Sequence, residues 1–488
     1  LATSAAAQLP PELDAYIEKA RVDWEVPGLA VVVVRDGKVL AAKGFGVRRL
    51  GSPERVDEHT AFDLASLTKS FTTAALATLV DEGKLSWDTP ARRYLPELEF
   101  ADVHRTQSVT IRDLLTHRVG LQDGNFMFRF TGYDTKEVIR RIRFLDEREP
   151  LRSGFIYSNV LYTAAGEAGA RAAGMTWDEL IRTRLLVPLG MTESAAGVPH
   201  DRAANHASPH ATIGGKQVPI RNKPALNIRP AAAVSSTPSD LAKWLLFQLG
   251  DGTWEGKRIL SQSAMNEMHS PHVIIPTTPE MRAARGVRYF GGYGLGWQVM
   301  DYHGHPMLWH SGNADGMPSY MAMFPNERIG FAVLINTWAS GNLRFALGTH
   351  IIDTLLGEPP RDQSGEVLAA YRRDSKRSEE AERELEQSRK MGTKPSLPLD
   401  AYAGTYADKL HGDIVVRMED GRLRLQFGGG EIAELEHWHY DTFHVMWKDD
   451  VYREYFSTFA AFGLDAKGNV RRLEMKLGRD DVSALRAP

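Results

Sequence analysis

The sequence predicts a protein of two domains, in which a domain of mixed α and β structure precedes an all-β domain. Three observations carry this prediction. Apolar, strand-like runs stand near both ends of the first 350 residues, and helical periodicity fills the stretch between them. After residue 398, short alternating runs separated by turns replace the helical pattern. We therefore expect an antiparallel sheet flanked by helices, followed by a small barrel or sandwich.

The N-terminal part predicts one helix and one hairpin. An amphipathic pattern covers 11–24 and is entered through a Pro-Pro pair. Apolar, β-branched runs at 28–34 and 39–47 then flank an Asp-Gly pair at 36–37. Asp-Gly between two such runs is typical of a tight hairpin turn, so we expect the two runs to pair.

Helical periodicity begins at Ser66. Phe71, Ala75 and Leu79 share one stripe, and Gly83 stands where this helix is expected to stop. Further helical patterns cover 111–117, 135–143, 160–173, 177–186 and 240–249. Strand character returns at 294–300, 306–310, 319–324 and 330–336. Strands at both ends of this region indicate one sheet that joins them, with the helical block covering one side.

The chain changes character again after the last of these strands. Residues 365–394 are dense in Arg, Lys and Glu with few large apolar side chains, which indicates a solvated helical linker. Short strand-like runs follow at 414–418, 422–427, 431–438, 443–448, 454–462 and 470–476. We divide the chain into a first domain over 1–360, a linker over 361–395 and a β-barrel domain over 396–488.

Composition bounds the classes of function. A net charge of −3 gives no electrostatic reason to expect nucleic acid as a partner. The absence of cysteine excludes disulfides and thiolate catalysis. No run of about 18 apolar residues is available to span a membrane. The small-residue stretch 2–7 is typical of the surroundings of a signal-peptidase cut, so we expect a periplasmic or secreted protein, with a cytoplasmic protein as the alternative.

Ser66-Leu67-Thr68-Lys69 is the most informative stretch of the chain. On a helix, positions i and i+3 share a face, so the Ser66 hydroxyl and the Lys69 amine can converge. A serine hydroxyl is a weak nucleophile until a base takes its proton. Lysine can be that base only where burial or a neighbouring cation lowers its pKa from about 10.4. The spacing therefore predicts a nucleophile and its base within four residues.

Two further short motifs follow in the first domain. Tyr157-Ser158-Asn159 precedes a helical pattern, and His310-Ser311-Gly312 ends an expected strand. In this order, the three motifs resemble those of the serine β-lactamase-like superfamily, which includes class C β-lactamases, D,D-peptidases, family VIII esterases and D-aminopeptidases. The stretches 110–121, 188–191, 236–242 and 293–297 resemble this superfamily as well. The resemblance covers about residues 10–355 and implies a β-lactamase/transpeptidase-like fold.

The resemblance also implies roles for individual residues. Ser66 would be the nucleophile, Lys69 its proton acceptor, and Tyr157 a proton shuttle, or a base if ionised. Asn159 would hold a substrate amide and orient Lys69. Gly312 would leave its strand bare for the approach of substrate. The backbone N–H groups of Ser66 and Asn313 would form the oxyanion hole.

His310 stands where many relatives carry the lysine of a Lys-Thr-Gly triplet. A lysine supplies a permanent charge for a substrate carboxylate, whereas histidine is mostly neutral near pH 7. We therefore expect His310 to belong to the catalytic group of an esterase or peptidase, and β-lactam turnover to be slow. The trailing β-domain resembles the lipocalin-like barrels appended to D-aminopeptidases and would shape access to the site, by a loop or through oligomers.

These observations predict a serine hydrolase that forms an acyl-enzyme on Ser66 and acts on small peptides or D-amino-acid-type amides. An esterase of broad acyl specificity is the first alternative, and a penicillin-binding sensor or assembly module without turnover is the second. We expect a small-molecule or peptide substrate, a homo-oligomer as a further option, and no cofactor. The spacing of His437, His439 and His444 invites a metal hypothesis, but no carboxylate partner is evident and we predict no metal site. His117 is expected to be structural.

Overall fold

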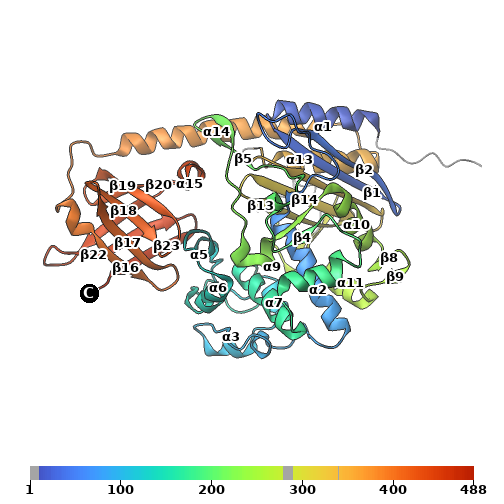
Figure 1. Cartoon of the computed structure of the whole chain (residues 1–488), viewed down its shortest axis with the longest axis horizontal. Coiled ribbons are helices and arrows are strands. Elements are labelled where there is room, and N and C mark those ends of the chain that lie inside the picture. The colour runs from blue at the N-terminus through green and yellow to red at the C-terminus, as the bar shows by residue number, and fades with distance from the viewer. Residues whose placement is uncertain (1–9, 279–289, 339) are drawn as a thin grey trace, which may run out of the picture.

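Figure 1 shows a computed structural model of the chain, which describes residues 10–278, 290–338 and 340–488. An α/β domain and a separate β-barrel lie side by side. One long helix, α14 (Gln363–Ser388), runs from the first to the second. Among the described helices, none is both long enough and apolar enough to cross a membrane.

The α/β domain is built on one antiparallel sheet of eight strands. Their spatial order is β10 (Val273–Ile274), β11 (Gly291–Tyr293), β12 (Gln298–Tyr302), β13 (His305–Ala314), β14 (Met317–Phe324), β15 (Ile329–Ile335), β1 (Gly28–Arg35) and β2 (Lys38–Gly46). Strand β1 pairs with both β2 and β15, with Val31 opposite Val333. The predicted sheet that joins both ends of the domain is therefore confirmed.

One predicted strand of this sheet is wrong in its extent. The pattern over 294–300 predicted a single strand, but β11 ends at Tyr293 and β12 begins at Gln298. Between them Gly296 has a φ of +81°, a left-handed conformation that interrupts a strand. A Cβ on Gly296 would also lie 2.8 Å from the Lys69 carbonyl oxygen, so this turn packs closely on the helix of the Ser66 motif.

Alternating side chains of β1 enter two different cores. Ala30, Val32 and Val34 pack toward the helical block, whose centre is the almost wholly buried helix α2 (Thr68–Asp81). Leu29 and Val31 pack on the opposite face, against α1 (Pro11–Asp23) and α13 (Leu343–Leu356). The predicted helical block thus covers one side of the sheet, and the two other helices cover the second side.

The helical block consists mainly of short helices. They are α3 (Val103–Ser108), α4 (Ile111–Leu115), α5 (Asn125–Phe130), α6 (Thr135–Arg141), α7 (Asn159–Ala173), α8 (Trp177–Ile181), α9 (Arg229–Ala232), α10 (Pro238–Leu249) and α11 (Gln262–His269). Short strands lie between the helices. Three of them form one small sheet, in the order β3 (Phe62–Asp63), β7 (Val234–Ser236) and β4 (Ala195–Ala196), and the others form two pairs, β5 (His210–Ile213) with β6 (Lys216–Pro219) and β8 (Thr253–Trp254) with β9 (Lys257–Arg258). The helix predicted over 111–117 stops early, because His117 takes a φ of +59°.

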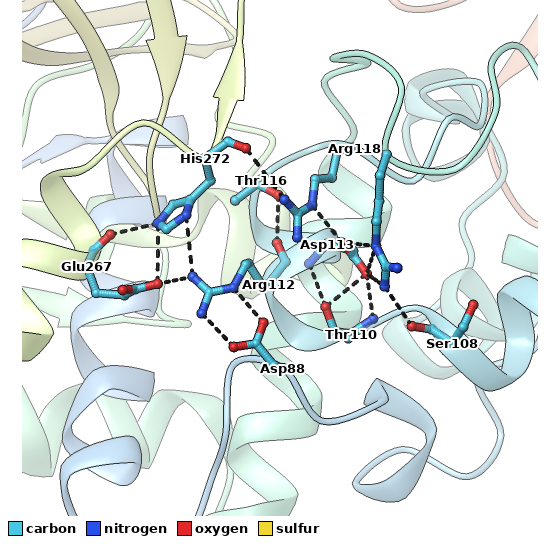
Figure 2. A network of polar contacts seen from close by, with 10 residues as sticks. Asp88, Ser108, Thr110, Arg112, Asp113, Thr116, Arg118, Glu267 and His272 are labelled. Atoms are coloured by element: carbon cyan, nitrogen blue, oxygen red, sulfur yellow. Dashed lines mark hydrogen bonds and ion pairs between the residues drawn. The ribbon is translucent and has the colours of Figure 1, made fainter.

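A polar network explains the sequence of α4 and the loop after it. Thr110 caps the helix through a capping box with Asp113, whose side chain is fully buried. Arg118 and Arg152 donate to the Asp113 carboxylate at 2.6 and 2.7 Å. Burial alone would raise the pKa of Asp113, but the hydrogen bonds from Arg152, Thr110 and Arg118 hold it below its usual value. Figure 2 shows the adjoining ion pairs of Arg112 with Asp88 and with Glu267, of which the second joins this helix to α11.

The second domain is a closed barrel of eight antiparallel strands. They are β16 (Gly404–Asp408), β17 (Gly412–Glu419), β18 (Arg422–Phe427), β19 (Ile432–His439), β20 (Thr442–Trp447), β21 (Phe459–Leu464), β22 (Val470–Leu477) and β23 (Asp480–Arg486). Closure comes from the pairing of β16 with β23, two strands that the sequence pattern did not predict. The predicted barrel is confirmed.

The strand expected over 454–462 is wrong in its first half. The last two residues of helix α15 (Asp450–Tyr455) overlap it, residues 456–458 lie outside both elements, and β21 begins only at Phe459. Asp449 starts the helix, because its carboxylate accepts the N–H of Tyr452 at 3.1 Å. Tyr455 and Phe456 pack against the core of the barrel.

Candidate active site

Ser66 is presented on a strained turn between β3 and α2. Ala65, directly before it, has a φ of +48°, which is uncommon for a residue with a side chain. The Asp63 carboxylate accepts the N–H of Ala65 at 3.3 Å and so supports this turn. Burial raises the pKa of Asp63 to about 7. The arrangement projects Ser66 at the start of α2 and toward a cavity.

Lys69 lies one turn further along and has no exposed surface. Its Nζ is 3.1 Å from the Ser66 Oγ, 2.7 Å from the Asn159 Oδ1 and 3.0 Å from the Ala231 carbonyl oxygen. Burial lowers the pKa of Lys69 well below its ordinary value. A neutral amine has two N–H groups for the amide and carbonyl oxygens, and one lone pair, which is left for the Ser66 hydroxyl proton. The contacts therefore suit an amine that accepts a proton from Ser66.

Tyr157 reaches the same hydroxyl from the other side. Its OH donates to the Ser66 Oγ at 2.9 Å, and the Lys69 Nζ lies 4.8 Å from the centre of its ring. Burial raises the pKa of Tyr157 above its ordinary value. Of the two roles that the sequence left open, this environment favours the protonated shuttle over an ionised base.

Asn159, the first residue of α7, connects Lys69 to a residue that the sequence analysis did not single out. The Asn159 Oδ1 accepts from Lys69, and its Nδ2 donates to the Asn125 Oδ1 at 2.8 Å. Asn125 is the first residue of α5. Its only sequence signal is an amide near the start of a helix, which many unrelated positions share.

His310 lies beside the site without contacting the nucleophile. Its ring is 2% exposed, and its centre is 6.2 Å from that of Tyr157. The His310 Nδ1 faces the Ser311 carbonyl oxygen at 2.8 Å, so Nδ1 carries the proton and Nε2 accepts from the Tyr293 OH at 3.0 Å. Burial and the nearby Lys69 lower the pKa of His310 to about 3, which makes the ring neutral near pH 7.

A second buried histidine lies beneath Tyr157. The ring centres of His117 and Tyr157 are 4.3 Å apart, and the His117 Nδ1 accepts the N–H of Ser158 at 3.0 Å. The N–H of Ile156 donates to the His117 carbonyl oxygen at 2.9 Å. His117 therefore fixes the backbone on both sides of Tyr157, which fits its expected structural role.

Gly312 and Asn313 follow His310 on β13. A Cβ on Gly312 would lie 2.3 Å from the Leu64 carbonyl oxygen and 3.1 Å from the Ala65 Cβ. The lack of a side chain thus lets β13 approach the turn that carries Ser66, a role different from the expected approach of substrate. Ser66 and Asn313 both line the cavity, as an oxyanion hole requires, and that assignment stays a prediction.

The cavity at Ser66 has a volume of about 960 Å³ and takes its walls from both domains. Its aromatic lining residues are Phe126, Phe128, Tyr133, Phe155, Tyr157, Tyr452 and Phe456. Two ion pairs stand in its wall, Arg129 with Asp315 at 2.7 Å and Lys223 with Glu431 at 2.9 Å. The barrel adds the Gly478–Arg479 turn. The cavity is at the upper end of the range for ligand sites and offers apolar, aromatic and charged surface.

The barrel histidines do not gather around a common point. The His437 Nε2 faces the Tyr440 carbonyl oxygen at 3.0 Å, whereas the His444 Nε2 contacts the Ser457 hydroxyl at 2.9 Å. Among the described residues, no group of three or more His, Asp or Glu side chains is arranged to hold a metal ion.

The fold and the Ser–Lys–Tyr arrangement define the class of serine hydrolases to which β-lactamases belong. The chain is a member of the beta-lactamase family, whose family model matches residues 13–356. Residues 388–484 match a second family, described as "Domain of unknown function (DUF3471)". This second match covers nearly all of the barrel.

Two curated relatives match the chain over two thirds of its length or more. The chain is 27% identical over 433 residues to the "Unguisins hydrolase ungD'" of Aspergillus campestris, covering 84% of this chain and 78% of that protein. It is 26% identical over 334 residues to "Protein flp" of Staphylococcus aureus, covering 67% of this chain and 62% of that one.

Two solved structures share the fold over nearly the whole chain. The octameric penicillin-binding protein homologue from Pyrococcus abyssi has a TM-score of 0.64 at 22% identity, over 97% of this chain and 99% of that one. SurE has a TM-score of 0.58 at 21% identity, over 98% and 99%.

Proposed function

We propose that this protein is a peptidase or amidase that forms an acyl-enzyme on Ser66. The observation that carries the proposal is the pair of contacts at the Ser66 hydroxyl, with a buried amine on one side and a protonated phenol on the other. A hydroxyl between a base and a proton donor is what nucleophilic catalysis requires. No cofactor or metal is part of the proposal.

The reaction would run in two halves. Neutral Lys69 takes the Ser66 proton while the Oγ attacks the substrate carbonyl carbon, and the oxyanion forms at the N–H groups of Ser66 and Asn313. Tyr157 then donates its proton to the leaving amine as the C–N bond breaks, and it recovers a proton from Lys69. In the second half, water gives a proton to Lys69 as it attacks the ester carbon, the C–O bond to Ser66 breaks, the Ser66 Oγ takes that proton from Lys69, and the acid product leaves.

Peptide substrates are supported by the size and lining of the cavity. About 960 Å³ is far more than a small acyl ester needs, and aromatic rings with two ion pairs suit a chain of mixed side chains. The names of the fungal relatives describe them as hydrolases of unguisins, and one related structure is titled as SurE with D-Leu. We therefore place peptides and D-amino-acid-type amides first among the substrates.

A carboxylesterase is the second candidate, and neutral His310 favours it. The imidazole supplies no permanent cation for the carboxylate of a β-lactam or of a D-alanyl terminus. A substrate with an uncharged acyl group does not need such a cation, so its binding would not be weakened by the neutral imidazole. Slow β-lactam turnover fits either candidate.

Active-site labelling and a substrate panel test the proposal. A fluorophosphonate should label the wild-type protein at Ser66, as located by mass spectrometry, and should not label Ser66→Ala. Turnover is then compared for D- and L-aminoacyl anilides, short linear and cyclic peptides, and p-nitrophenyl esters. Turnover of esters alone would favour the esterase, and labelling without any turnover would favour a sensor or assembly module.

A homo-oligomer stays a prediction. Light scattering coupled to size-exclusion chromatography gives the mass directly, and a single species at the monomer mass would contradict it.

A further inference from the structure

The two domains exchange aromatic and apolar side chains across their contact. Phe130, the last residue of α5, is fully buried within the hydrophobic core of the barrel rather than in that of its own domain. Its ring centre lies 4.8 Å from that of Trp447, 5.0 Å from Tyr452 and 5.8 Å from Phe456. In return Leu410 of the barrel belongs to the core of the α/β domain.

Two turns of the barrel enclose the same helix. The turn between β18 and β19 approaches the end of α5, where the N–H of Glu431 donates to the Phe130 carbonyl oxygen at 2.9 Å. A Cβ on Gly430 would lie 1.9 Å from that oxygen. The turn between β22 and β23 approaches Phe126, because a Cβ on Gly478 would lie 2.1 Å from the Phe126 ring.

Helix α5 is too short to hold its position by itself. It has six residues, and an isolated helix of that length is not stable in water, so its packing partners decide where it lies. Met127 faces the α/β core and Phe130 faces the barrel core. The barrel therefore supplies the apolar contacts that hold the C-terminal end of α5.

The first residue of α5 leads directly to the proposed base. Asn125 accepts from Asn159, and Asn159 accepts from Lys69. These two hydrogen bonds connect the barrel-anchored helix to the amine that lies 3.1 Å from the nucleophile. A displacement of α5 would therefore change both the position and the pKa of the Lys69 amine.

We propose that Phe130 is a positioning residue, through which the barrel holds α5 and, by way of Asn125 and Asn159, orients Lys69 for the acylation of Ser66. The inference rests on the proposed serine hydrolase function. It assigns the barrel a part in the chemical step itself, in addition to its place in the cavity wall. Phe130 would act without touching the substrate.

Neighbouring glycines give a matched test from the barrel side. Gly430→Ala places a methyl group against the end of α5, whereas Gly429→Ala adds one where no atom lies within 4 Å. The readout is the burst-phase acylation rate with p-nitrophenyl acetate, a probe too small to span the cavity. We expect Gly430→Ala to acylate about 10²-fold more slowly, because small misplacements of catalytic groups cost that much, and Gly429→Ala to match the wild type.

Variants of the aromatic core test the same inference from the other side. Phe130→Ala should slow acylation, and Phe130→Leu, which keeps most of the apolar volume, should restore it. Phe462→Ala is the control, because Phe462 lies in the same barrel core against Tyr402 and Phe443. Phe462→Ala should lower the melting temperature and leave acylation unchanged.

The pH profile separates positioning from general loosening. The Asn159 oxygen favours the charged form of Lys69, so a loosened contact should move the acidic limb of the acylation rate to lower pH in Gly430→Ala and Phe130→Ala. Wild-type rates and an unmoved profile in folded Gly430→Ala would overturn the inference. A wild-type protein that acylates with no substrate would instead overturn the proposed function.

Discussion

At the level of single residues, the surroundings of Lys69 carry the chemistry. Its three polar contacts are a hydroxyl, an amide oxygen and a carbonyl oxygen, and no carboxylate among the described residues forms an ion pair with it. Without a counter-charge, burial works against the ammonium form. Burial thereby favours the neutral amine, which is the form that can accept a proton.

This environment predicts the pH dependence of acylation. The pKa of Lys69 is lowered, so the free base prevails above that lowered pKa, and the rate falls as the pH falls through it. Below it, kcat/KM should drop about tenfold for each pH unit. Stopped-flow acylation between pH 5 and 10 measures the profile. A rate that rises only near pH 10, as for an ordinary lysine, would contradict the assignment of the base.

Tyr157→Phe tests the proton shuttle. The variant keeps the ring against His117 but loses the hydroxyl that donates to Ser66. We expect kcat to fall by about 10²- to 10⁴-fold, the usual contribution of a positioned acid, with KM little changed. Steady-state kinetics on an anilide substrate measure it. A comparable rise in KM with kcat unchanged would show a binding role instead.

Residue patterns predicted the centre of the site better than its support. Ser66 and Lys69 are one helical turn apart, so their spacing implied their contact. The motif of Tyr157 and Asn159 was assigned to the same site by resemblance, and both residues contact Ser66 or Lys69. Asn125 and Tyr293 contact Asn159 and His310 only because the fold brings distant segments together. No local pattern encodes such contacts, and the folded geometry was needed to find them.

At the level of elements, sequence periodicity predicted the long helices and the inner strands. The wrong or missing predictions fall where tertiary contacts, rather than local sequence, decide the structure. The helix over 111–117 ends early because His117 takes a left-handed conformation, in which its ring and its carbonyl oxygen bind the backbone on either side of Tyr157. Strand β23 was not predicted because Asp480–Arg486 begins with two aspartates and holds only two apolar side chains larger than alanine, and its pairing with β16 is set by barrel closure. Tertiary context overrides weak local preference in both cases.

The turn between β16 and β17 holds a buried histidine that should make the stability of the barrel depend on pH. His411 is buried between Asp408, at 3.0 Å, and Asp480, at 3.7 Å. Burial lowers the pKa of His411, but the hydrogen bond to Asp408 and the negative charges of Asp408 and Asp480 outweigh it and raise the pKa above its ordinary value. Such a group stabilises the fold below the unfolded pKa of about 6.5, and that stability is lost as pH rises through the higher folded pKa.

Urea unfolding of the wild type and of His411→Gln measures this contribution. The free energy of unfolding of the wild type should decrease between pH 6 and 9 relative to that of the variant, by about 1.4 kcal/mol for each unit by which the pKa is raised. Asp63 titrates near pH 7 in both proteins, so the difference between them isolates His411. Parallel curves would show that the histidine is not charged.

At the level of the whole molecule, the active-site cavity belongs to both domains. The β22–β23 turn brings Arg479 to its wall, where that charge acts on the Asp123 carboxyl group. No carboxylate of the described chain forms an ion pair with Arg479, in contrast to Arg129 and Lys223. An acidic group on a bound peptide could take that position.

Arg479→Ala should therefore change selectivity. We expect KM for a peptide with a carboxylate at the matching position to rise severalfold, and KM for its amide analogue to stay the same, because an exposed ion pair contributes about 1 kcal/mol or less. Arg471→Ala, an exposed arginine of the same strand pair that is absent from the cavity wall, is the control. Equal effects on both peptides would assign Arg479 a structural role.

Helix α14 has a mechanical consequence for the molecule as a whole. Its 26 residues extend about 39 Å. Near its start Ser364 accepts from the Trp24 indole at 3.0 Å, and just past its end Arg389 donates to the Trp438 carbonyl oxygen at 2.9 Å. A rod fastened at both ends behaves as a ruler. Substitutions on its solvated face should leave these two contacts intact. An insertion or deletion in the helix would change the distance between them, so both could no longer form at once.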